Sequence, residues 1–176
     1  MFSRLHHVAY RCQDAQRTVD FYTKIVGLEF AAGLVSPEGH KHWHYGDPSE
    51  NIHIFFKLGD GSYLAFFEIA GYPDEKPDPN TPLWVKHIAF EVPNLAFLEA
   101  CKKRLIEHGV DCRGPKDHHI CHSLYFEDPD GHRLEIAARD DTPGMWAKLA
   151  AEAPGELEKW NRQKARRAKA ATAATA

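Results

Sequence analysis

The sequence predicts an α+β fold built from two βαβββ modules, followed by a C-terminal helical extension. Two stretches, beginning at His7 and at His87, repeat the same order of a β-rich run, a polar turn, an amphipathic segment and a glycine. Each stretch is followed by an aromatic pair and an Asp-Gly turn, FFKLGDG at 55–61 and YFEDPDG at 125–131. A repeat of this length indicates one supersecondary unit used twice.

Each repeat begins with a short strand and then a helix. Apolar residues keep helical spacing over 19–26 in the first repeat and over 97–105 in the second. Asp14 and Asn94 precede these segments and are the expected N-caps, and the glycine after each segment is the expected stop. The later Asp-Gly pairs are typical of hairpin turns between strands.

The last strand of each repeat carries a carboxylate in an apolar setting. Glu68 lies in SYLAFFEIAG and Glu135 lies in HRLEIAA. An unpaired buried carboxylate is costly, so both residues call for a partner such as a metal ion.

The predicted domain spans 1–138, with modules 1–72 and 84–138 joined by a Pro-rich linker at 73–83. Residues 139–176 lie outside the repeat, and their composition favours a basic helix that ends in an Ala/Thr tail.

Composition narrows the class of protein. The 176 residues carry a formal net charge of −3, which gives no reason to expect a nucleic-acid or membrane partner. The start of the sequence lacks the apolar core of a signal peptide, and the four cysteines show no CxxC spacing. We therefore expect a cytoplasmic protein with reduced thiols. Twelve histidines are many for this length, and imidazole is the commonest metal ligand.

Strand alternation separates the adjacent histidines His6 and His7. His7 shares a face of its strand with small Ala9, as His87 does with Ala89, which leaves room in front of each imidazole. His6 falls on the bulky face and matches a lysine in the second repeat. His7 is therefore the predicted ligand of the pair.

Together the repeats supply two histidines and two carboxylates at places that we interpret as equivalent. Such a set suits Zn²⁺, Ni²⁺, Fe²⁺ or Mn²⁺ and leaves positions open for a substrate. The predicted metal ligands are His7, Glu68, His87 and Glu135.

These motifs resemble the vicinal oxygen chelate superfamily, which includes glyoxalase I, bleomycin-resistance proteins and type I extradiol dioxygenases. The resemblance rests on H-[VI]-A-[YF] in both repeats, on DFYTKIVGL and on EDPDG-x-x-x-E, and it covers about residues 4–138. It implies that the two modules form a cupped mixed sheet around one divalent metal, with the four residues named above as its ligands.

The resemblance leaves two chemistries open. In an isomerase or lyase of the glyoxalase I or epimerase type, Glu68 would complete the ligand set and abstract a proton next to a carbonyl, with Zn²⁺ or Ni²⁺ as the metal. Tyr72 stands where glyoxalase I tends to have an Asn for glutathione.

In an extradiol dioxygenase, Fe²⁺ or Mn²⁺ at a site of two histidines and one carboxylate would bind both oxygens of a catechol and O₂. The signature of those enzymes matches His118, Leu124-Tyr125, the DPDG turn and Glu135. It fails at one place, because Lys116 stands where the signature has a small or aliphatic residue. The resemblance makes His118 and Tyr125 catalytic, and we favour this chemistry.

The aromatic residues of the strands and of 40–46 point toward the dioxygenase chemistry, because they suit a flat apolar ligand, and His42, His44 or His53 could add a base. A metal-free small-molecule binding or resistance protein is the second alternative, and the presence of all four candidate ligands argues against it. A small-molecule substrate and a homodimer are the expected partners, the homodimer by resemblance alone.

Overall fold

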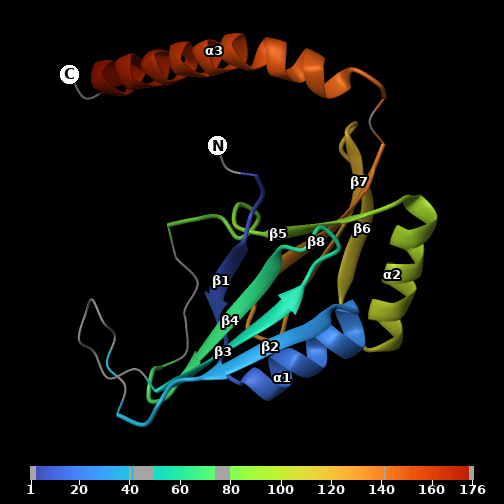
Figure 1. The fold of residues 1–176 in the computed structure, drawn as a ribbon. Helices are drawn as coiled ribbons and strands as arrows, with labels where there is room; N and C mark the ends of the chain where they lie inside the picture. The colour runs from blue at the N-terminus through green and yellow to red at the C-terminus, as the bar shows by residue number, and fades with distance from the viewer. Residues whose placement is uncertain (1–2, 40, 42–49, 74–79, 141, 175–176) are drawn as a thin grey trace.

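The computed structural model describes residues 3–39, 41, 50–73, 80–140 and 142–174. Within them the chain forms two βαβββ modules and a long C-terminal helix (Figure 1). The predicted α+β class is confirmed.

The first module contains β1 (His7–Arg11), α1 (Ala15–Asp20), η1 (Phe21–Val26), β2 (Glu29–Val35), β3 (Asn51–Lys57) and β4 (Tyr63–Ile69). Its strands form a mixed sheet in the order β1-β4-β3-β2, with β1 parallel to β4 and the other pairs antiparallel. η1 is a wider helical turn that continues α1.

The second module contains β5 (Ile88–Val92), α2 (Leu95–Glu107), β6 (Cys112–Asp117), β7 (Cys121–Glu127) and β8 (Arg133–Arg139). Its sheet has the order β5-β8-β7-β6, with β5 parallel to β8. The two modules therefore repeat the same topology.

Local sequence explains where the helices begin. The Asp14 carboxylate accepts a hydrogen bond from the Arg17 backbone N–H at 2.8 Å, and Asn94 does the same for Phe97 at 3.0 Å. Both residues act as the predicted N-caps. Gly27 ends η1 with a φ of 92°, a left-handed conformation that glycine adopts without strain.

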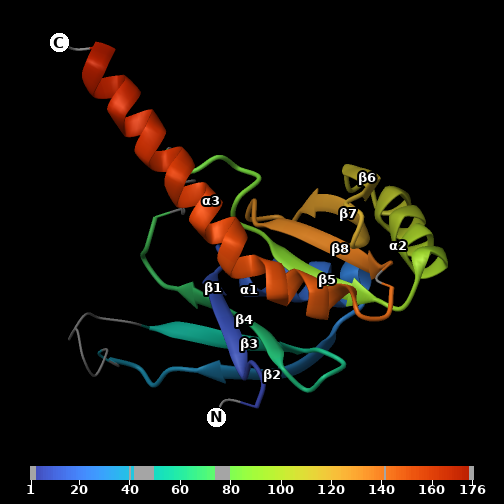
Figure 2. The same ribbon diagram turned by 90° about the horizontal axis from the view of Figure 1, so that it is seen from above.

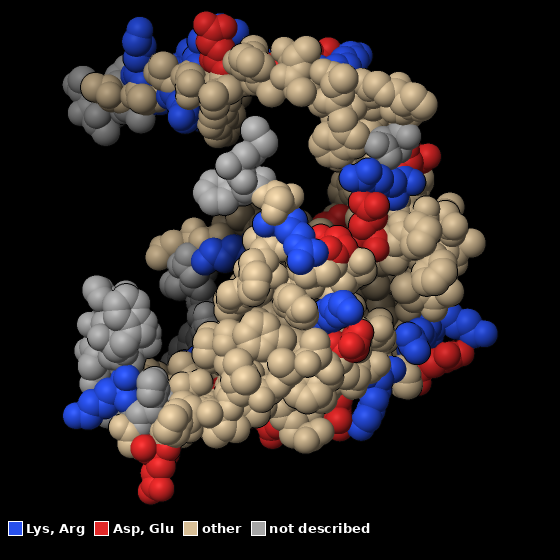
Figure 3. Space-filling model, viewed as in Figure 1, with Lys and Arg blue, Asp and Glu red and all other residues tan. Residues whose placement is uncertain are grey.

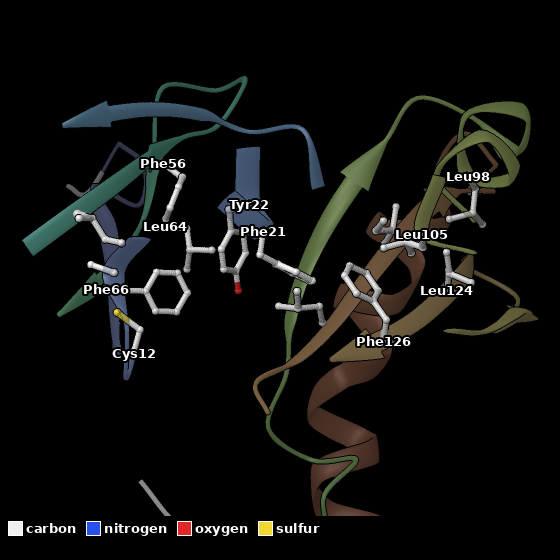
Figure 4. Close-up of a cluster of buried hydrophobic side chains, with 14 of the residues drawn as sticks. Cys12, Phe21, Tyr22, Phe56, Leu64, Phe66, Leu98, Leu105, Leu124 and Phe126 are labelled. Carbon is white, nitrogen blue, oxygen red and sulfur yellow. The ribbon is translucent and has the colours of Figure 1, made fainter. Parts of the chain in front are cut away.

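The two modules share one hydrophobic core (Figure 4). Phe21 and Tyr22 lie between the sheets, with Phe66 on one side and Phe126 on the other. The ring centres of Tyr22 and Phe66 are 5.1 Å apart, and those of Phe21 and Phe126 are 6.4 Å apart. The helix of the first module thus packs against strands of both.

The sheets remain separate within one chain. β1 and β5 each lie at the end of a four-stranded sheet, and among the described residues the two strands do not pair (Figure 2). The single cupped sheet expected around the metal is therefore divided into two within this chain.

Residues Met145–Ala174 form α3, in agreement with the predicted helical extension. The helix projects away from the modules, and every side chain described in it is exposed except half-buried Met145 and Gln163. Lysine and arginine side chains gather toward its C-terminal end (Figure 3). No helix in the described part of the chain is long and apolar enough to cross a membrane.

Candidate functional site

A histidine and a carboxylate of the second module already lie side by side. Nε2 of His87 is 3.1 Å from Oε2 of Glu135. The two residues share a face of their sheet, because Ala89, two residues after His87, lies opposite Glu135 across β5 and β8. Glu135 is 7% exposed, and Ser123 donates a hydrogen bond of 2.5 Å to its other oxygen.

The orientation of the His87 ring suits metal binding. Nδ1 lies 3.2 Å from the Val85 carbonyl oxygen, which can only accept, so Nδ1 is the donor of this hydrogen bond. Nε2, which faces the carboxylate, is then the nitrogen that a metal would take. Two ligands held about 2.1 Å from one metal at right angles lie about 3.0 Å apart, close to the observed spacing. This pair of donors fits a divalent metal.

His7 lies at the start of β1 with its side chain exposed. Its Nδ1 is 2.8 Å from Nδ1 of His6, so one ring donates to the other. His53 and Phe55 lie on the same face of this sheet, with ring centres 6.0 and 5.7 Å from that of His7. His7 is therefore part of an open aromatic face.

His7 does not join His87 and Glu135 within the chain. Over the part of the molecule that the structure describes, no three His, Cys, Asp or Glu side chains are arranged to hold a metal ion. One chain thus presents the predicted ligands in two separate places, His7 on the first module and the His87–Glu135 pair on the second.

Glu68 lies on the opposite face of its sheet from His7. Glu68 shares its face with Leu64 and Phe66, which are buried in the core, whereas His7 pairs with Tyr63 on the other face. Its Oε2 accepts a 2.6 Å hydrogen bond from the backbone N–H of Ala15, the first residue of α1. The structure therefore gives Glu68 a partner other than the one expected from sequence.

The residue of the first module that matches Glu135 is Ala65. Ala9 lies opposite Ala65 across β1 and β4, as Ala89 lies opposite Glu135 across β5 and β8. Ala65 is fully buried and carries no donor atom. The position that would supply a fourth ligand is therefore occupied by a methyl group, and the interpretation of Glu68 as the equivalent of Glu135 is wrong by three residues of register.

His118 and Tyr125 are brought together, as the dioxygenase signature implies. The Tyr125 hydroxyl is 2.9 Å from Nε2 of His118, and Tyr125 lies opposite Glu135 across β7 and β8. Burial raises the pKa of the Tyr125 hydroxyl above its ordinary value, and the negative charge of Glu135 acts in the same direction. The phenol therefore keeps its proton at neutral pH.

His53 is a further histidine of the His7 face. Its ring stacks on Phe67 at 3.6 Å between ring centres, and its Nε2 is buried without a hydrogen-bond partner among the described residues. Burial lowers the pKa of His53, and His7 adds to the effect, so the ring favours its neutral form. His42 and His44 lie outside the described residues.

Comparison with known proteins agrees with this architecture. The model of the Glyoxalase/Bleomycin resistance protein/Dioxygenase superfamily matches residues 4–136, and the chain belongs to that superfamily. It is similar to MhqA of Bacillus subtilis (strain 168), which carries the name of a ring-cleaving dioxygenase, with 30% identity over 142 residues. That match covers 80% of this chain and 42% of MhqA, so the chain spans less than half of that relative.

The lactoylglutathione lyase of Escherichia coli O157:H7 is also 30% identical, over 78% of this chain and 94% of the lyase. Among solved structures, a glyoxylase/bleomycin resistance protein/dioxygenase domain from Frankia sp. EAN1pec superimposes with a TM-score of 0.64 at 19% identity. The superposition covers 82% of this chain and 97% of that domain. This likeness supports the fold, and the two relatives by sequence carry different activities.

Proposed function

We propose that the protein is a divalent-metal-dependent oxidoreductase that opens the ring of a small catecholic substrate, in the manner of an extradiol dioxygenase. The observation that carries the proposal is Ala65 at the place that matches Glu135. It leaves His7, His87 and Glu135 as a set of two imidazoles and one carboxylate. Such a set with open positions is typical of non-haem iron oxygenases.

The chemistry that a bound Fe²⁺ or Mn²⁺ supplies at such a set is chelation of two vicinal substrate oxygens, with a position left for O₂. His118 and Tyr125 supply the proton chemistry in this proposal. Tyr125 begins protonated and donates its hydrogen bond to Nε2 of His118, 2.9 Å away. A substrate hydroxyl passes its proton to the Tyr125 oxygen as Tyr125 passes its own proton to Nε2 of His118. The buried Nε2 of His53 has no hydrogen-bond partner among the described residues and is a second candidate base on the His7 side.

The separation of the ligands supports a site shared between two copies of the chain. His7 of one protomer would meet His87 and Glu135 of the other, and a twofold dimer would hold two such sites. β1, which begins at His7, and β5, which directly follows His87, are each open along one edge in the described chain. The aromatic His7 face would then close over the metal and exclude water.

A mixing experiment tests the shared site. His7→Ala and Glu135→Ala each remove one ligand from both sites of a homodimer, so neither variant should retain stoichiometric metal. A mixed dimer regains one intact site, formed by His7 of the Glu135→Ala chain and by His87 and Glu135 of the other. We expect mixing after mild dissociation to restore metal to about one quarter of the wild-type content per chain. No recovery, with mixed dimers demonstrated by mass spectrometry, would place the site within one chain.

A lyase or isomerase of the glyoxalase type is the second candidate. The E. coli lyase, which this chain covers over 94% of its length, favours it. That chemistry draws its proton-abstracting carboxylate from a fourth ligand. Glu68 is committed to the N-terminus of α1, and the matching position is an alanine.

Oxygen uptake separates the two candidates. Protein loaded anaerobically with Fe²⁺ should consume O₂ with one or more members of a catechol panel, and each ring-cleavage product should absorb in the visible range. Turnover of a hemithioacetal or epimerisation by Ni²⁺ or Zn²⁺ protein, with no uptake in the Fe²⁺ sample, would overturn the dioxygenase proposal. Ligand binding with neither activity would indicate the small-molecule binding protein instead.

A further inference from the structure

A groove of about 250 Å³ lies beside His87 where the two modules meet. Both modules and the segment between them contribute to its wall, which includes Tyr10, Arg11, Leu83, Lys86, His87 and Arg133. The groove is thus next to the His87–Glu135 pair and combines apolar side chains with three cationic ones.

Among the described residues, no carboxylate lies within ion-pair distance of Arg133, which borders this groove. Arg133 lies on β8 two residues before Glu135 and so shares the face of that carboxylate. Its guanidinium carbon is 4.6 Å from the centre of the Tyr125 ring, and this cation–π contact fixes the side chain over the candidate acid–base pair. Nε is buried and has no hydrogen-bond partner among the described residues.

A half-buried guanidinium without an ion-pair partner among the described residues is expensive, and an anion in the groove would lower that cost. The carboxylates of the groove do not serve this purpose in the described chain. Asp130 is bonded to Arg17 at 2.6 Å. Glu127 lies opposite Arg133 across β7 and β8, but it is exposed and no oxygen of it comes within ion-pair distance of that guanidinium among the contacts of the described residues.

The rest of the wall adds positive charge. Arg11 donates a hydrogen bond to the carbonyl oxygen of Pro73, which holds the side chain and leaves its charge in place. Two cationic side chains, Arg11 and Arg133, beside a partly apolar hollow favour a ligand that joins an apolar body to an anionic end.

We propose that this groove binds a carboxylate of the substrate, with Arg133 as the residue that recognises it. A guanidinium holds a carboxylate through two parallel hydrogen bonds, which here come from the two terminal nitrogens because Nε is buried. The anionic end lies against Arg133, and the ring of the substrate extends toward His87. The substrate class is then an aromatic compound with a carboxylate-bearing side chain. That the ring is a catechol rests on the proposed function, whereas carboxylate binding does not.

Binding to metal-free protein tests the groove by itself. Phenylacetate and its neutral analogue phenylacetamide are titrated into the wild-type chain by calorimetry. We expect phenylacetate to bind at least tenfold more tightly than phenylacetamide. Equal affinities would overturn the proposal without any variant. Inorganic phosphate and sulfate are titrated in the same way. If either ion binds as tightly as phenylacetate, the groove is a general anion site, and the assignment to an aromatic carboxylate is contradicted.

Arg133→Gln should weaken phenylacetate binding at least tenfold, and Arg133→Lys should recover only part of it, since one ammonium cannot make the paired bonds. Arg139→Gln is the matched control, because Arg139 lies on the same strand, is exposed and pairs with Glu91 at 2.8 Å. Unchanged binding in Arg133→Gln, or equal loss in the control, would contradict the proposal. Circular dichroism establishes that each variant is folded.

Kinetics distinguish this inference from the function on which it partly rests. In Fe²⁺-loaded protein, Arg133→Gln should raise KM for a carboxylated catechol at least tenfold more than it raises KM for unsubstituted catechol. If no catechol is oxidised but phenylacetate binds through Arg133, the proposed activity fails and the groove stands. If catechols are oxidised and KM for both rises equally, the activity stands and the specific role of Arg133 fails.

Discussion

The hydroxyl of Tyr22 donates a hydrogen bond of 2.9 Å to Oδ2 of Asp128, and this bond joins the two modules. Both side chains are buried. Asp128 also accepts from Nδ1 of His132 and from the backbone N–H groups of residues 130 and 132. The carboxylate thus holds the turn between β7 and β8 against the helix of the first module. That turn leads directly into the strand that carries Arg133 and Glu135.

Removing this carboxylate should destabilise the whole chain. Asp128→Ala leaves the Tyr22 hydroxyl and the turn without their acceptor, so we expect a loss of about 3 kcal/mol in the free energy of unfolding. Tyr22→Phe removes one bond and should cost about 1–2 kcal/mol. Urea unfolding measures both values. Asp111→Asn, at an exposed carboxylate, is the control and should stay within about 0.5 kcal/mol of wild type.

The same contact predicts that the free energy of unfolding decreases at alkaline pH. Burial raises the pKa of Tyr22 well above its ordinary value, and the charge of Asp128 adds to the shift. The folded chain keeps the phenol proton at a pH where the unfolded chain loses it. The contribution is therefore complete below about pH 10 and declines above it, by about 1.4 kcal/mol per pH unit. Urea unfolding of wild type and Tyr22→Phe between pH 9 and 11 should show this extra slope in wild type alone, and parallel curves would contradict it.

Much of the fold follows from local sequence. Asp14 and Asn94 are N-caps in the structure, and the two Asp-Gly turns place glycines with a φ of 80° at Gly61 and 82° at Gly131. These signals depend on a few neighbouring residues. The division into two separate sheets depends instead on which faces pack together across the module junction. A repeat in the sequence is compatible with one joined sheet or with two, so that feature could not be predicted from it.

The candidate site shows the same limit in finer detail. Strand alternation predicts His7 and His87 on the non-core faces, and the structure agrees. Apolar surroundings alone match Glu68 to Glu135. The Asp-Gly turns give the correct register, because the fourth residue after Gly61 is Ala65 and the fourth after Gly131 is Glu135. An acidic residue within an apolar run suggests burial, but it does not say which face of the strand is buried. Here the N-terminus of α1, rather than a metal, satisfies the carboxylate.

Glu68→Ala is therefore expected to affect stability rather than metal content. The substitution removes the acceptor for the Ala15 N–H and a negative charge near a helix N-terminus, which together contribute about 1 kcal/mol. Metal content by mass spectrometry should remain at the wild-type level. Glu135→Ala is the paired variant and should lose the metal. Loss of metal in both variants would return Glu68 to the ligand set.

The thiols should differ in reactivity. Burial raises the pKa of Cys12 to about 11, so about one thousandth of that thiol is ionised at pH 8. Cys12 is also 3% exposed. We expect iodoacetamide at pH 8 to modify Cys12 last of the four cysteines, as read by peptide mass spectrometry. Early modification of Cys12 in folded protein would contradict the burial of this residue in the shared core.

Finally, α3 should contribute little to the stability of the single chain. Leu157 and Trp160 are 62% and 49% exposed, and the Trp160 ring contacts Arg167 of the same helix with its guanidinium carbon 4.5 Å from the ring centre. Because neither side chain is buried against the modules, Leu157→Ala and Trp160→Ala should each change the free energy of unfolding by less than about 0.5 kcal/mol. Leu105→Ala, in the core, should cost about 2–5 kcal/mol and calibrates the measurement. A loss above about 1 kcal/mol for the α3 variants would show that the helix is packed in solution, and dependence of that loss on protein concentration would identify a second copy as its partner.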